Sequence, residues 1–122
     1  MPVTNYLLEN AGKAVLRGQA INSADYFYFA GSDNTFNGNE TEVVNDYFHK
    51  TVGWVSEGID SKFTIELGLL ECTGSYIAAV GLIDDNEIGS GTPCIILPSD
   101  IGLKSSNFTV EIEGKILFRR PL

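Results

Sequence analysis

Acidic side chains gather at the end of one apolar run, in the stretch SYIAAVGLIDDNEIGSGTP from Ser75 to Pro93. Together with a second loop, the tip Asp84-Asp85-Asn86-Glu87 could hold a calcium ion, because calcium accepts oxygen ligands in a flexible geometry. A charged, solvated turn is the commoner role of such a cluster, and charge at the end of a strand hinders pairing with another chain. We therefore expect Asp84 and Asp85 to cap a buried strand, with no metal bound.

A second group with calcium-ligand spacing starts at Asp33. Asp33, Thr35, Asn37 and Gly38 match the first half of an EF-hand loop. The twelfth position of that loop must be a bidentate glutamate, and here it is Val44. The sequence therefore predicts no EF-hand and no metal site.

Groups able to catalyse a reaction are sparse. His49 is the one histidine, in the middle of a predicted strand, and we expect it to face solvent or to be locally paired. No serine or cysteine stands in a recognised nucleophile motif. The glycines of IGSGTP lack the lysine or the helix that phosphate-binding loops require. We predict no catalytic residue, no cofactor and no enzymatic activity.

The two cysteines, Cys72 and Cys94, each lie in a stretch that we predict as strand. Their spacing matches no zinc pattern. In a reducing compartment they are best interpreted as two small buried hydrophobic residues. A disulfide across neighbouring strands is the alternative.

Charge and length limit the function classes. Sixteen acidic residues against eight basic ones give a formal net charge of −8, which repels phosphate backbones and anionic lipid surfaces. We expect no nucleic-acid and no membrane partner. The 122 residues, 43% of them hydrophobic, suffice for one domain with a core. Lys13 and Arg17 precede no continuous apolar segment, so we expect no signal peptide or membrane span and a chain that folds in the cytoplasm.

An amphipathic helix is predicted in TNYLLENAGKAVLRG, with Thr4 as the N-cap and Gly18 as the stop. Gly12 weakens this helix by roughly 1 kcal/mol relative to alanine, so packing must stabilise it. The packing partner is either the body of the domain or a neighbouring chain. We predict residues 1–22 as a helical segment with a hinge at residues 18–23. The face that we expect to pack carries Leu7, Leu8, Ala11, Ala14 and Val15.

From residue 23 to residue 122 the hydrophobic pattern has a period of two, which is typical of strands. Predicted central strands, apolar on both faces, are 25–30 and 75–83. Phe63, Ile65, Leu67 and Leu69 share one face of a strand at 62–71. The remaining predicted strands are 47–55, with Phe48, Val52 and Trp54 on one side; 93–97; and 107–120, with Phe108, Val110, Ile112, Ile116 and Phe118 on its buried face.

These elements predict an all-β fold, mainly an antiparallel β-sandwich, with one short N-terminal α-helix. The order of five features along the chain is also informative: NYLLENAGKAVL (Asn5–Leu16), the aromatic strand Tyr26–Phe29, Glu42, the step Tyr47-Phe48, and VGLIDD (Val80–Asp85). In this order they resemble the small tail or fibre-associated structural proteins of tailed bacteriophages. Those proteins have an NxLLxxxxxxxL helix, a glutamate before an aromatic-led strand, and a later GLFD-like turn.

The resemblance implies a virion structural module without catalysis, which forms a homo-oligomer or docks on other virion proteins. It implies synthesis in the host cytoplasm and a place in the tail, baseplate or fibre apparatus. A capsid decoration protein or head fibre is an alternative within this class. A carbohydrate- or receptor-binding module is a second class, in which Phe36, Asn34 and Asn37 of one loop would contact a host-surface glycan.

Overall fold

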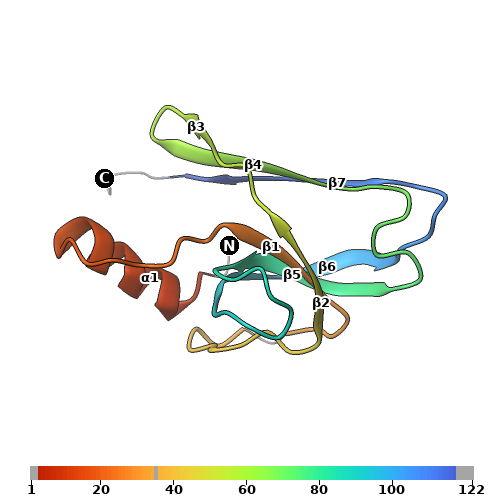
Figure 1. Cartoon of the computed structure of the whole chain (residues 1–122), viewed down its shortest axis with the longest axis horizontal. Helices are drawn as coiled ribbons and strands as arrows, with labels where there is room; N and C mark the ends of the chain where they lie inside the picture. Colours follow the sequence, from red (N-terminus) through yellow and green to blue (C-terminus); the bar gives the residue numbers. More distant parts are fainter. Residues whose placement is uncertain (1–2, 35, 118–122) are drawn as a thin grey trace.

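The computed structural model describes residues 3–34 and 36–117, which form one helical segment and seven strands (Figure 1). The helical segment consists of α1 (Asn5–Ala11) and a π-helical turn, η1 (Gly12–Leu16). The strands are β1 (Tyr26–Ala30), β2 (Asp46–Thr51), β3 (Val55–Glu57), β4 (Asp60–Leu67), β5 (Tyr76–Ile83), β6 (Pro93–Leu103) and β7 (Val110–Ile116).

Two antiparallel sheets face each other (Figure 1). One has four strands in the order β2-β1-β5-β6, and the other has three in the order β3-β4-β7. The predicted fold class, a mainly antiparallel β-sandwich with a short N-terminal helix, is thereby confirmed. The division of the chain at residue 22 stays a prediction.

The central strands β1 and β5 are buried on both faces, as their two-sided apolar pattern predicts. Phe27 and Phe29 face the core between the sheets, where the Phe27 ring lies 5.7 Å from the Phe63 ring of β4. Tyr28 and Ala30 point to the opposite face and pack in a second apolar cluster with Val43. Val43 belongs to the connection between β1 and β2, so this segment contributes to the cover of the outer face of the sheet.

One predicted strand, 47–55, is wrong, because the structure divides it between the two sheets. β2 ends at Thr51, and β3 begins at Val55 in the other sheet. The residues that connect the two strands form hydrogen bonds with the segment before β1. The Val52 amide donates to the carbonyl of Asp25, and the Trp54 indole donates to the carbonyl of Ala24. These contacts hold the chain where it crosses between the sheets.

Strand β4 ends at Leu67, so the prediction that Leu69 and Cys72 lie in a strand is also wrong. Residues 69–74 form turns, in which Leu69 is half exposed and Cys72 has a φ of 56°. The Glu71 carboxylate closes this turn by accepting hydrogen bonds from the Gly68 amide and the Lys50 ammonium. These two contacts lower the pKa of Glu71.

The last two strands differ from the prediction in length. β6 continues past the predicted end at residue 97 to Leu103. It is an edge strand, which tolerates Pro98, and its register with β5 shifts after the pair of Ala79 and Pro98. In β7, exposed and half-buried residues alternate as predicted, but Phe108 lies before the strand. The predicted residues from Phe118 to Arg120 lie outside the described residues. Within residues 3–34 and 36–117, no helix is both long and apolar enough to cross a membrane.

Gly81 in β5 is required by the close packing of the central strands. A Cβ atom there would lie 1.9 Å from the carbonyl oxygen of Ile95 and 2.8 Å from the Tyr28 ring. We expect Gly81→Ala to lower the free energy of unfolding by about 3 kcal/mol, because neither neighbour can move without breaking the sheet. Urea denaturation followed by circular dichroism measures this loss.

Gly53→Ala is the matched control, since a Cβ at Gly53 would meet no atom within 4 Å. We expect its free energy of unfolding to stay within about 0.5 kcal/mol of that of the unmodified chain. Equal values for the two variants would contradict the packing argument.

Candidate functional site

The N-terminal helix is fastened to the four-stranded sheet at its first residues. The Thr4 side chain accepts a hydrogen bond from the Leu7 amide, which confirms Thr4 as the N-cap, and its hydroxyl donates to the carbonyl of Pro93 at 2.7 Å. Val3 forms a bridge with Ile95 of β6. At the other end of the helix, Gly18 has a φ of 61° and ends it as predicted.

Side chains of the helix add further attachments. The Tyr6 hydroxyl donates to the Asp84 carboxylate at 2.5 Å, and burial together with this carboxylate raises the pKa of Tyr6. The Asn5 amide donates to the carbonyl of Gly38. Leu7 packs against the main core. The helix therefore has a defined orientation on the sandwich.

The predicted packing face divides between the two sides of the helix. Leu7 is turned toward the core of its own chain, and Ala14 is half buried. Leu8 and Val15 are 62% and 80% exposed, and Ala11 is also exposed. Leu16, which the sequence pattern did not place on this face, is 83% exposed. We call the four exposed residues the helix stripe: Leu8, Ala11, Val15 and Leu16.

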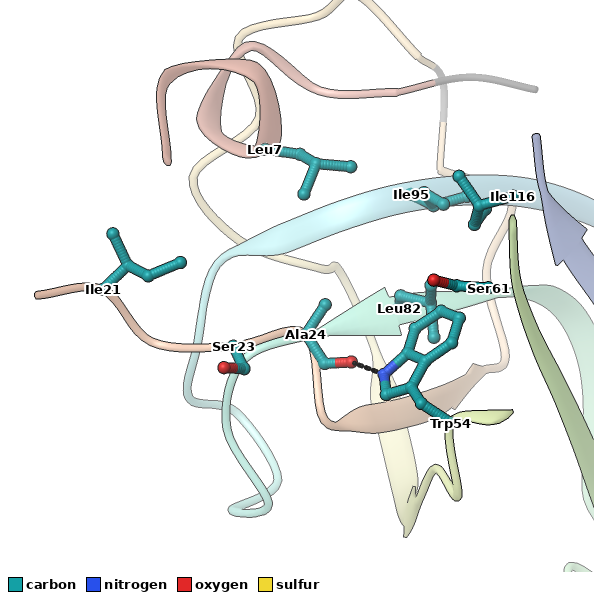
Figure 2. A pocket seen from close by; sticks show the side chains of 9 residues that line it. All are labelled: Leu7, Ile21, Ser23, Ala24, Trp54, Ser61, Leu82, Ile95 and Ile116. Atoms are coloured by element: carbon teal, nitrogen blue, oxygen red, sulfur yellow. Dashed lines mark hydrogen bonds between the residues drawn. The ribbon is translucent and has the colours of Figure 1, made fainter. Parts of the chain in front are cut away.

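A cavity of about 440 Å³ lies beside the helix, where both sheets and the segment before β1 meet (Figure 2). Two serine hydroxyls, of Ser23 and Ser61, also line it, and the Trp54 indole already donates to the carbonyl of Ala24. This lining suits contact with an apolar group. The apolar residues around it are Leu7, Ile21, Trp54, Leu82, Ile95 and Ile116.

The acidic tip after β5 is used for internal hydrogen bonds. Asp84 accepts from the Tyr6 hydroxyl and from the Thr92 amide, and Asp85 accepts from the Glu87 amide. Asp84 and Asp85 therefore cap the end of the strand, as predicted, and both are half buried. Among the described residues, no group of three or more histidine, cysteine or acidic side chains could hold a metal ion.

His49 is buried and locally paired. Its Nε2 lies 2.6 Å from the Asp46 carboxylate, and its Nδ1 lies 2.8 Å from the carbonyl oxygen of Asp85. The same carboxylate accepts from the Gly89 amide. Because both ring nitrogens already have partners, neither is left to activate a nucleophile. This network joins β2 to the loop after β5.

The pairing of His49 with Asp46 was missed by sequence reasoning for a geometric reason. Residues three apart in a regular strand point to opposite faces. Here β2 has a bulge at Tyr47, so that Asp46 is opposite Ala30 while His49 is opposite Tyr28. Both side chains therefore lie on the outer face, and no pattern in the sequence marks the bulge.

The loop between β1 and β2 uses its polar groups to maintain its own shape. The Asn34 side chain both donates to and accepts from the backbone of Val44. The Glu40 carboxylate accepts from the amides of Asn37 and Gly38. Phe36 is 41% exposed, and Thr35 of the EF-hand comparison lies outside the described residues.

The two cysteines are both free, so the disulfide alternative is wrong. Cys94 is buried in β6, and burial raises the pKa of its thiol to about 12. Burial also raises the pKa of Cys72, which is half buried. Raised thiol pKa values leave little reactive thiolate at neutral pH, so both residues behave as small hydrophobic side chains.

The buried pair of His49 and Asp46 generates a stability prediction. His49→Leu would leave the Asp46 carboxylate without its main partner, and we expect it to lower the free energy of unfolding by about 3 kcal/mol. The midpoint of urea denaturation measures the loss. In the control Glu9→Gln, which breaks an exposed ion pair with Lys13, we expect a change below about 0.5 kcal/mol. A His49→Leu midpoint equal to that of the control would show that the network does not hold the loop.

Comparison with models of protein families, with curated proteins and with solved structures finds no match to this chain.

Proposed function

We propose that this chain is a non-enzymatic structural module that assembles through its N-terminal helix. The observation that carries the proposal is the helix stripe, in which Leu8, Val15 and Leu16 are largely exposed on a helix that is fastened to the sandwich. Monomeric soluble proteins rarely expose contiguous apolar patches larger than roughly a few hundred Å², and such patches commonly mark interaction sites. A helix whose orientation is already defined loses little further freedom when it packs against another chain.

The polar groups of the chain support a structural role. The residues with the chemistry that a catalytic site would need, His49, Asp84 and Asp85, take part in hydrogen bonds that hold loops and the helix in place. The cavity beside the helix has no charged side chain in its lining. These features favour a protein whose surface contacts other chains.

The resemblance to small tail or fibre-associated proteins of tailed bacteriophages suggests the setting. We propose that the module belongs to a virion, in the tail, baseplate or fibre apparatus, and that it is made in the host cytoplasm. Neighbouring copies or other virion proteins would cover the helix stripe. The same stripe would serve a capsid decoration protein or head fibre, which binds a symmetric lattice.

The glycan-binding alternative has less support. Phe36 is accessible for stacking on a sugar ring. The Asn34 side-chain amide, which would recognise the hydroxyl groups of the sugar, is already hydrogen-bonded to the backbone of Val44. Glu40 is likewise bonded to the loop backbone. A sugar would have to break the bonds that shape the loop.

Assembly through the helix stripe predicts a change in solution mass for Leu8→Asp. We expect the unmodified chain to be an oligomer by light scattering. Burial of each leucine or valine of the stripe contributes roughly 1.5 to 3 kcal/mol, and a buried aspartate reverses one such contribution. Leu8→Asp should therefore have a lower mass with an unchanged circular dichroism spectrum.

Leu70→Asp is the matched control, because Leu70 is 84% exposed in the turn after β4 and not on the helix. Its mass should equal that of the unmodified chain. An unchanged mass for Leu8→Asp, or equal losses in both variants, would contradict assembly through the stripe.

A further inference from the structure

The two sheets have four edge strands, and three of them carry features that hinder pairing with another chain. β3 has only three residues. β2 is distorted by the bulge at Tyr47. β6 contains Pro98, and Val3 covers part of its edge at Ile95.

The fourth edge strand, β7, has none of these features. It pairs with β4 over seven consecutive residues, Val110 to Ile116, without a register shift. It contains no proline, and within the described part of the chain no strand pairs with its outer edge. Backbone amides and carbonyls of a regular strand are thus available to a further strand.

The charges on the exposed face of β7 are poorly matched within the chain. Glu111 lies opposite Glu66 of β4, and Lys115 lies opposite Lys62. Like charges directly opposite each other destabilise a sheet. Lys115 reaches past β4 to the Glu57 carboxylate at 2.7 Å, whereas Glu113 makes no salt bridge among the described residues. An added strand would improve this face if it brought opposite charges.

We propose that the outer edge of β7 pairs with β7 of a second copy of this chain, antiparallel and centred on Gly114. In this register Glu113 of each copy lies opposite Lys115 of the other. The four charges then alternate in sign on the exposed face, and each opposed pair is attractive. The two three-stranded sheets become one continuous sheet across a two-fold axis.

Other antiparallel registers are less favourable. A shift of one residue would place exposed positions opposite half-buried ones, which the alternation along a strand forbids. In a register centred on Ile112, Glu111 of one copy lies opposite Glu113 of the other, and the two carboxylates repel. In registers centred on Glu113 or on Lys115, that charged residue lies opposite the same residue of the other copy. The register at Gly114 is the one near the middle of β7 in which no like charges are directly opposed.

The inner face of β7 fits the same register. Ile112 and Ile116 are only half buried within one chain. In the register centred on Gly114, Ile112 of each copy lies opposite Ile116 of the other, which gives two symmetric pairs. Gly114 itself packs against the Phe63 ring, where a Cβ atom would lie only 2.3 Å away. The contact therefore buries apolar side chains while small residues meet at the axis.

This surface goes beyond the proposed function, because it does not involve the helix. The test therefore uses the full chain with Leu8→Asp, in which association through the helix stripe is removed. We expect this chain to be a dimer by light scattering. Adding Lys115→Glu should weaken the dimer roughly tenfold to thirtyfold, because two attractive pairs become two repulsive ones.

Exchanging the charges at positions 113 and 115 tests whether these two residues face each other across the dimer. Combining Glu113→Lys with Lys115→Glu restores opposite signs in the same register, so the dimer should return. Glu57→Gln removes the intrachain partner of Lys115 and should leave the dimer unchanged. A monomer at all concentrations, or a dimer insensitive to Lys115→Glu, would overturn the proposal. In the monomer case, the charges of β7 would act to prevent pairing.

Cysteine pairing tests the register directly, in a Cys72→Ser background that retains the buried Cys94. A mixture of one chain carrying Glu113→Cys and another carrying Lys115→Cys should form a disulfide-linked dimer on mild oxidation. Each chain alone should link far less, because positions 113 and 115 are then not opposite themselves. Equally fast linking of the Glu113→Cys chain alone would exclude the register centred on Gly114.

Discussion

The packing of β1 against β5 is the constraint on which the rest of this structure depends. Both strands are apolar on both faces, so the fold must cover two faces of the same sheet. The three-stranded sheet covers one face, where Phe63 packs against Phe27. On the other face, Val43 from the connection between β1 and β2 packs in one cluster with Tyr28. The close approach of Gly81 to Tyr28 and Ile95 leaves little tolerance in the position of either strand.

Covering two faces requires that loops and the helix be held in place, and the polar residues do this. Asp84 holds Tyr6 of the helix, the pair of His49 and Asp46 holds the loop after β5, and Glu40 holds the turn at Gly38. Each of these groups could carry chemistry in isolation. In the folded chain each has hydrogen bonds to other parts of the same molecule, so these acidic residues and the histidine hold the helix and the loops in place.

Two surfaces are not covered by the described part of the chain: the helix stripe, which includes Leu8 and Val15, and the outer edge of β7. One is apolar, while the other offers backbone hydrogen-bonding groups and side chains of both charge signs. They differ in chemistry and lie on separate elements, so two distinct contacts could build an assembly larger than a dimer. That property agrees with the proposed place in a repetitive particle.

The sequence by itself determined the fold class, the central strands and the capped helix, because hydrophobic period and the types of Thr4 and Gly18 are local signals. It also indicated that Asp84 and Asp85 end a strand. Only the tertiary structure decided where residues 47–55 cross between sheets, that Leu7 packs inward while Leu8 stays exposed, and that Asp46 meets His49. These outcomes depend on a bulge and on contacts with segments distant in the chain. Such contacts leave no periodic trace in a single sequence, because they are set by which faces meet after the strands have formed.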